Sequence, residues 1–255
     1  MLVDSHCHLD MLKLGDEPLQ SVLDEARAAG VERMLCVAVN LERFPAMMEK
    51  IAPHPQVLAS VGVHPDHEQG EDPDEDRLAA LARDERIVAI GETGLDYYRT
   101  QGDTEWQRAR FRRHIRAARA IGKPLIVHTR EAREDTIAIL RDEQARDAGG
   151  VLHCFTESWD MARAALDIGF YVSFSGIVTF RNATELKEVA KRVPADRMLV
   201  ETDAPFLAPV PRRGKPNRPA WVRHVAEYLA ELRGEDFEQL CATTTENFDR
   251  LFCPG

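Results

Sequence analysis

Two histidines, His6 and His8, lie one residue apart directly after the first apolar segment of the chain. If this segment is a β-strand, its side chains alternate between two faces, so Asp4, His6 and His8 share one face and Cys7 points to the other. Neutral imidazole is the commonest protein ligand for metal ions, and one strand can supply two. Taken alone, the pair fits a metal site and a strand end with ordinary hydrogen-bonded histidines equally well.

Other residues of metal-binding type follow further short apolar runs. They are His64 in VGVHP, Glu92 in AIGETGLD, His128 in PLIVHTR, His153 in GVLHCF and Asp203 in LVETDAP. Each one singly is more often a hydrogen-bonded polar group near the surface. Five of the nine histidines nevertheless follow apolar runs in this way, and so many at equivalent positions favour a metal site. The set is too large for one tetrahedral ion and suits two divalent ions that share a carboxylate, with Glu92 as the natural bridge.

The identity of the ions stays open at this point. Mixed histidine and carboxylate ligands accept Mg²⁺, Mn²⁺, Zn²⁺ or Fe²⁺, so the pattern predicts a class of site and not a particular ion.

The elements that must position these residues alternate along the chain. Apolar runs rich in Val, Ile and Leu lie at 2–4, 33–39, 57–63, 87–91, 124–128, 150–154, 170–175 and 198–201. Segments with helical spacing lie between them at 19–29, 45–51, 76–83, 104–121, 132–144, 159–168 and 183–192, and two more close the chain at 221–232 and 237–251. Such alternation predicts parallel strands with crossover helices.

Eight repeats in 255 residues predict an α/β fold, a single (β/α)₈ TIM barrel domain over residues 1–255 with C-terminal helices. An open doubly wound sheet is the alternative, and the lack of a G-x-G-x-x-G after an early strand disfavours it. Active sites of such barrels lie at the C-terminal ends of the strands. The predicted ligands therefore meet at one rim.

Composition limits the kinds of partner. The net charge of −10 argues against a uniformly basic nucleic-acid-coating surface, although residues 212–218 form a local basic loop.

No run of 18 apolar residues and no leader pattern are present, so we expect a cytoplasmic protein without a membrane partner. Five scattered cysteines without a CxxC suit reduced thiols. The sequence indicates no obligate protein partner, and we expect a monomer.

The motifs LVDSHCHLD, PLIVHTREAREDT, HCF and MLVETDAPFLAP resemble those of the TatD-type metal-dependent deoxyribonucleases, a branch of the amidohydrolase superfamily, and the resemblance covers nearly the whole chain. It implies that two divalent ions are bound, one by His6, His8, Glu92 and Asp203, the other by Glu92, His128 and His153. It also implies that His64 helps to bind a phosphate or a metal-bound water. The basic loop departs from the family at Arg218, where relatives often carry glutamate.

The resemblance implies a hydrolase that trims single-stranded DNA from its 3′ end. Glu92 or Asp203 would take a proton from the attacking water, and His64 would stabilise the phosphate. The candidates for contacts with neighbouring phosphates are Arg130, Arg212, Arg213, Lys215 and Arg218, and those for base stacking are Tyr97, Tyr98, Phe206 and Trp221.

Three alternatives remain open. The same site could cleave an ester or amide, as in the removal of D-amino acids from tRNA. It could instead hydrolyse a small phosphorylated or cyclic metabolite, which the acidic net charge permits. The third alternative is a barrel that binds a partner without catalysing a reaction. A failure to bind any metal would favour this alternative.

Overall fold

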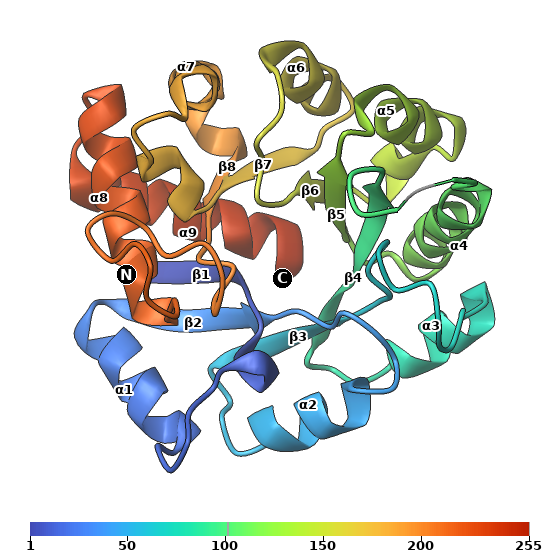
Figure 1. Ribbon diagram of the computed structural model, residues 1–255, viewed down its shortest axis with the longest axis horizontal. Helices are drawn as coiled ribbons and strands as arrows, with labels where there is room; N and C mark the ends of the chain where they lie inside the picture. The colour runs from blue at the N-terminus through green and yellow to red at the C-terminus, as the bar shows by residue number, and fades with distance from the viewer. Residues whose placement is uncertain (101, 255) are drawn as a thin grey trace.

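The computed structural model describes residues 1–100 and 102–254. Within them, eight parallel strands form one sheet in the order β1 to β8, wrapped into a barrel with helices around the outside (Figure 1). The strands are β1 (Leu2–Cys7), β2 (Val31–Cys36), β3 (Val57–Val61), β4 (Ile87–Asp96), β5 (Leu125–Arg130), β6 (Gly150–Leu152), β7 (Tyr171–Phe174) and β8 (Met198–Val200). The predicted (β/α)₈ barrel is confirmed.

The helices begin and end at local signals in the sequence. They are α1 (Leu19–Ala28), α2 (Phe44–Ile51), α3 (Glu75–Leu81), α4 (Glu105–Ile121), α5 (Arg133–Asp142), α6 (Trp159–Asp167), α7 (Thr184–Arg192), α8 (Val222–Arg233) and α9 (Phe237–Phe252). The side chains of Asp74, Ser158 and Asp236 cap the first turns of α3, α6 and α9. Gly122 and Gly234 end α4 and α8 in the left-handed conformation. No helix of the described residues is long and apolar enough to span a membrane.

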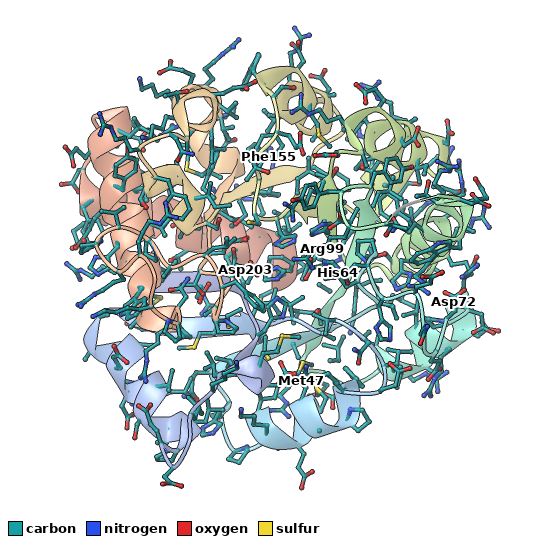
Figure 2. The ribbon with its side chains drawn as sticks, in the orientation of Figure 1. Met47, His64, Asp72, Arg99, Phe155 and Asp203 are labelled. Atoms are coloured by element: carbon teal, nitrogen blue, oxygen red, sulfur yellow. The ribbon has the colours of Figure 1, made fainter. Side chains whose placement is uncertain are left out.

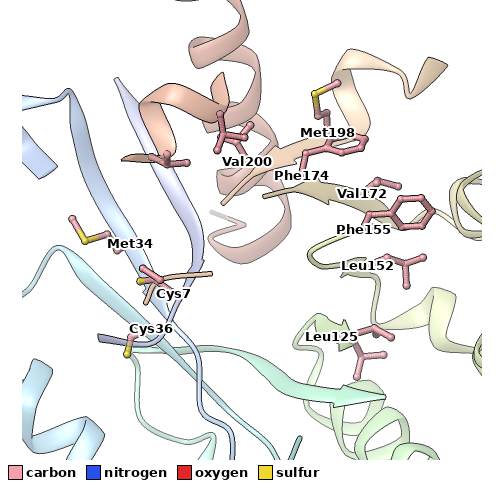
Figure 3. Close-up of a cluster of buried hydrophobic side chains, with 14 of the residues drawn as sticks. Cys7, Met34, Cys36, Leu125, Leu152, Phe155, Val172, Phe174, Met198 and Val200 are labelled. Atoms are coloured by element: carbon pink, nitrogen blue, oxygen red, sulfur yellow. The ribbon is translucent and has the colours of Figure 1, made fainter. Parts of the chain in front are cut away.

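The strands separate two apolar layers. Inside the barrel, Val3, Leu35 and Ile126 pack with side chains of the other strands and with Phe248 and Phe252 of α9, which crosses one end of the barrel (Figure 1). The alternate side chains face the helices and form the larger cluster, part of which Figure 3 shows. Most positions on both faces of the strands are therefore buried, which explains the continuous apolar runs in the sequence; Glu32 and Arg33 near the start of β2 are the main exception.

Strand β4 is longer than its apolar run. The prediction that Glu92 follows this strand is wrong, because β4 continues to Asp96 and pairs with β5 as far as Asp96 opposite Arg130. His128 likewise lies inside β5. The two strands approach closely at Gly94, where φ is 135° and a Cβ atom would lie 2.0 Å from the carbonyl oxygen of His128. Only glycine fits there, so Gly94 allows the backbone of β4 to approach that of His128, one of the predicted ligands.

The barrel closes where β1 meets the segment after β8. His8 N donates to Ala204 O at 2.8 Å, and Asp203 N donates to His6 O at 2.9 Å. Cys7 and Ala204 form an isolated parallel bridge. The backbone bonds that close the barrel are thus made by three of the predicted site residues themselves.

A buried polar contact reinforces this seam. The Asp4 carboxylate accepts hydrogen bonds from Thr202 N at 2.8 Å and from Thr202 Oγ1 at 2.5 Å, and neither residue is exposed to solvent. Burial raises the pKa of Asp4 to about 8, although the bonds from Thr202 act in the opposite direction. Strand alternation placed Asp4 on the same face as His6 and His8, and its side chain serves the seam through Thr202.

Replacing Asp4 with alanine tests this seam. Asp4→Ala leaves two buried donors of Thr202 without an acceptor, and we expect a loss of about 2–4 kcal/mol in the free energy of unfolding, measured by urea denaturation. Asp167→Ala, a change at an exposed aspartate of α6, is the control and should shift stability by less than about 0.5 kcal/mol. Equal stability of the two variants would show that the Asp4–Thr202 contact does not hold the seam.

Candidate metal centre

A cavity of about 590 Å³ opens at the end of the barrel where the strands terminate. Figure 2 places His64 and Asp203 near the centre of this end of the molecule. The parallel strands bring six predicted residues to the wall of the cavity: His8, His64, Glu92, His128, His153 and Asp203. His6 is fully buried just behind them. The sequence prediction that these strand ends converge therefore agrees with the geometry.

Glu92 lies at the centre of the group. Its side chain is only 3% exposed, and imidazole nitrogens surround both carboxylate oxygens. Glu92 Oε2 lies 3.4 Å from His6 Nε2 and 3.8 Å from His8 Nε2. Oε1 lies at 3.3, 3.2 and 2.8 Å from His64 Nε2, His128 Nδ1 and His153 Nε2. One carboxylate thus joins two sets of potential ligands, one on each oxygen.

The first set is completed by Asp203. Its Oδ1 lies 3.3 Å from His8 Nε2 and 3.7 Å from His6 Nε2, and the two imidazole nitrogens are 3.2 Å apart. Asp203 has a φ of 58°, the left-handed region that non-glycine residues adopt rarely. The ligand atoms of His6, His8 and Asp203 lie close enough to share one ion.

The second set lies on the other side of Glu92. The ligand atoms of His64, Glu92 and His128 are also close enough to share an ion, and so are those of His6, His153 and Glu201. His64, which the resemblance assigned to phosphate or water, therefore lies among the potential ligands. The rings of His6 and His153 are stacked at 4.0 Å, which places the two sets side by side.

Hydrogen bonds on the outer nitrogens orient the imidazoles. His8 Nδ1 bonds to Val37 O at 2.8 Å, and His153 Nδ1 lies 3.3 Å from Glu201 Oε1. A carbonyl and a carboxylate can only accept, so these two Nδ1 atoms carry the hydrogen, and each Nε2 presents its lone pair when the ring is neutral. Partners of this kind commonly fix the tautomer of metal-binding histidines.

The arrangement fits a bound cation. His153 Nε2 is buried and lies 2.8 Å from Glu92 Oε1. Two acceptors at this separation repel each other unless a positive charge lies with them. A proton or a metal ion supplies that charge, and the combination of imidazoles and carboxylates suits divalent transition metals.

The pKa values show how strongly the site favours positive charge on its histidines. Burial alone lowers the pKa of His64, but the charge of Glu92 and the hydrogen bond that His64 donates to Asp66 outweigh it and raise the pKa to about 9. For His153, burial is likewise outweighed, by the charges of Glu92 and Glu201, and its pKa is raised well above the usual value. The pKa of Glu92 is well below its usual value, because the neighbouring histidines overcome the effect of burial.

Among the predicted phosphate contacts, Arg130 lines the cavity. Its guanidinium lies 3.7 Å from the centre of the Tyr98 ring, and that side chain is 57% exposed. Phe206, 51% exposed, lines the cavity near His8. Tyr97 instead donates its hydroxyl to Asp135 at 2.5 Å.

The basic loop lies elsewhere. Arg212, Arg213, Lys215 and Arg218 are absent from the cavity wall formed by the described residues. Arg212 lies over the Trp221 ring at 5.5 Å and Arg213 over the Phe180 ring at 3.8 Å. Arg218 pairs with Glu17 at 2.6 Å and with Glu25 at 2.9 Å, so the residue in which the loop departs from the family pattern ties the loop to the region of α1.

Several functional neighbours were missed by sequence reasoning. Glu201 stands in the same ETDAP motif as Asp203, Asp66 follows His64 by two residues, and Asp96 ends the ETGLD motif. The available signal was a carboxylate two residues from a predicted ligand for Asp66 and Glu201, and four residues from Glu92 for Asp96. Buried Asn217 holds the loop after β8 by donating to Thr202 O and Phe206 O. Arg43 and Arg99 also line the cavity.

Comparison with known proteins gives consistent relatives. The family model for TatD-related DNases matches residues 3–253. A protein of Escherichia coli K12 named uncharacterized metal-dependent hydrolase YcfH is 52% identical over 253 residues, covering 98% of this chain and 95% of that protein. A protein of Escherichia fergusonii named 3′-5′ ssDNA/RNA exonuclease TatD is 36% identical and covers 91% of both chains. The crystal structure of the TatD homologue YJJV from Escherichia coli K12 superposes with a TM-score of 0.90 at 28% identity, covering 98% of this chain and 97% of that one.

The position of Glu92 between the two sets generates a prediction for ion binding. Calorimetric titration of metal-stripped protein with Mn²⁺ should show two ions per chain, and the affinity should rise with pH because the ions displace protons from histidines of raised pKa. Glu92→Gln should weaken both ions about tenfold or more, whereas His8→Ala should weaken mainly one. Glu85→Gln, at an exposed position, is the control. Unchanged binding in Glu92→Gln would rule out the shared carboxylate.

Proposed function

Because the chain belongs to the TatD-related DNase family, we propose that this metal-dependent hydrolase removes nucleotides from the 3′ ends of single-stranded DNA. One observation carries the proposal. A single cavity combines the histidine and carboxylate cluster with the guanidinium of Arg130 and the exposed ring of Phe206. The printed name of the Escherichia fergusonii relative supports the choice of substrate and direction.

The residues that would hold the ions fall on either side of Glu92. His6, His8 and Asp203 would hold one ion with Glu92 Oε2, and His128 and His153 would hold the other with Oε1. When bound, such ions supply a water nucleophile at neutral pH and stabilise negative charge on the phosphoryl oxygens.

Asp203 is the better of the two candidate bases. Its side chain is 14% exposed and lines the cavity, whereas Glu92 is 3% exposed and surrounded by imidazoles. Burial raises the pKa of Asp203, but the hydrogen bond and charge of His8 outweigh this and lower it, so the carboxylate is ionised at neutral pH. Asp203 is thus available to take a proton from the attacking water, while Glu92 holds the ligands together.

The remaining cavity wall provides contacts for a nucleic acid strand. Arg130 can donate to a phosphate beside the one being cleaved, and its stacking on Tyr98 restricts the guanidinium in place. Tyr98 and Phe206 are exposed rings on which bases can stack, a contact that does not depend on the identity of the base. With a net charge of −10, the protein attracts DNA only locally, so binding should be weak and sensitive to salt.

The direct test is the degradation of single-stranded DNA labelled at either end. Metal-stripped protein resupplied with Mg²⁺, Mn²⁺ or Zn²⁺ should release mononucleotides from the 3′ end. His128→Ala should lower the rate at least about a hundredfold while keeping the melting temperature of the metal-free protein, because His128 contacts Glu92 and lies at the cavity wall. His224→Ala, a change on α8 outside the cavity wall, is the control.

Three results would contradict parts of the proposal. Release from the 5′ end would overturn the direction. Wild-type rates in His128→Ala would overturn the assignment of this residue. Binding of metal without cleavage of DNA under any ion would overturn the nuclease function and favour an ester, an amide or a small phosphodiester as substrate.

A further inference from the structure

Arg99 lies between β4 and α4 at the rim of the cavity, and Figure 2 shows it beside His64. Its side chain contacts the carboxylate that follows β3, because Nη1 donates to Asp66 Oδ2 at 2.5 Å. Its backbone N–H contacts the carboxylate that ends β4, because it donates to Asp96 Oδ1 at 2.8 Å. Nε lies 3.9 Å from the other oxygen of Asp96. A single residue thus connects two aspartates from different segments.

Each of these aspartates holds one histidine of the centre. Asp66 Oδ1 bonds to His64 Nδ1 at 2.5 Å, and Asp96 Oδ2 bonds to His128 Nε2 at 3.0 Å. The inner nitrogens of both rings face Glu92 Oε1, at 3.3 and 3.2 Å. The ring centroids of the two histidines are 4.5 Å apart.

These contacts form a closed circuit, in which each residue contacts the next through a hydrogen bond or a close pair of polar atoms. It runs from Glu92 through His64, Asp66, Arg99, Asp96 and His128 and back to Glu92. Asp96 is fully buried, whereas the Asp66 side chain is 32% exposed. Asp66 is bonded to His64 through one carboxylate oxygen and to Arg99 through the other, so the bond from Arg99 restricts the rotation of a partly exposed carboxylate that orients His64.

We propose that the Arg99 side chain is a positioning group that holds Asp66 and, through it, keeps His64 on the same oxygen of Glu92 that His128 contacts. The inference rests on the proposed metal centre and does not depend on the nuclease activity. A guanidinium suits this role because its planar donors hold the Asp66 carboxylate in a fixed direction, whereas a lysine ammonium is a point charge on a flexible stem.

The test compares three variants of the full chain. Arg99→Gln removes the charge, Arg99→Lys keeps it, and Arg77→Gln is the matched control. Arg77 is similarly exposed, at 49% against 54% for Arg99, and pairs with one carboxylate, Glu71, at 2.8 Å. Binding of Mn²⁺ is measured by calorimetry, stability by thermal melting of the metal-free protein, and turnover with whichever substrate the wild-type protein cleaves.

We expect Arg99→Gln to weaken one of the two ions about tenfold, to lower kcat by a similar factor and to leave KM within about twofold, since partners behind metal ligands typically change affinity by this much. Arg99→Lys should restore only part of the loss, and Arg77→Gln should match the wild-type protein. In Arg99→Gln, adding Asp66→Asn should cause little further loss, because both changes break the same circuit.

Several results would overturn the inference. A rise in KM with unchanged metal affinity and kcat would make Arg99 a substrate contact, and a fall in melting temperature alone would make it a structural ion pair. If the wild-type protein bound no Mn²⁺, the proposed metal centre itself would fail. Normal binding by the wild-type protein with equal binding by Arg99→Gln would overturn only the role of Arg99.

Discussion

The feature on which the site depends is a buried carboxylate surrounded by imidazoles. Five histidine nitrogens lie within 3.8 Å of Glu92, whose side chain is 3% exposed. Burying this group would be costly without positive charge beside it. The raised pKa values of His64 and His153 mean that protons on these two rings supply part of that charge in the metal-free protein. The burial of Glu92 is therefore the feature that would draw divalent ions to this site.

The barrel supplies this arrangement because its strands are parallel. Residues at the ends of β1, β3, β6 and β8 and inside β4 and β5 reach one rim although nearly 200 positions separate the first from the last. The seam between β1 and β8 is closed by backbone bonds of His6, His8 and Asp203, and the buried Asp4–Thr202 contact supports it. Barrel closure and ligand placement therefore depend on the same few residues.

The sequence predicted the fold and the convergent residues because both follow from periodic patterns. Strand alternation placed His6 and His8 on one face, and the ends of apolar runs located the other side chains. Glu92 and His128 were misplaced relative to their strands because β4 and β5 continue their pairing beyond the apolar residues. The distances that bring Asp66, Asp96 and Glu201 to their histidines depend on how separate strands and loops pack, which a carboxylate near a predicted ligand in the sequence suggests but does not determine. The contacts of the arginine side chains in residues 212–218, which lie outside the cavity wall, could not be predicted because they too depend on how separate segments pack.

The most direct measurement is anomalous X-ray diffraction from crystals of the protein grown with Mn²⁺. The account predicts two manganese peaks in the cavity, each in contact with a different oxygen of Glu92, one beside His8 and Asp203 and the other beside His128 and His153. A single peak, or two peaks of which one does not touch Glu92, would contradict the central claim that this carboxylate joins two metal sites.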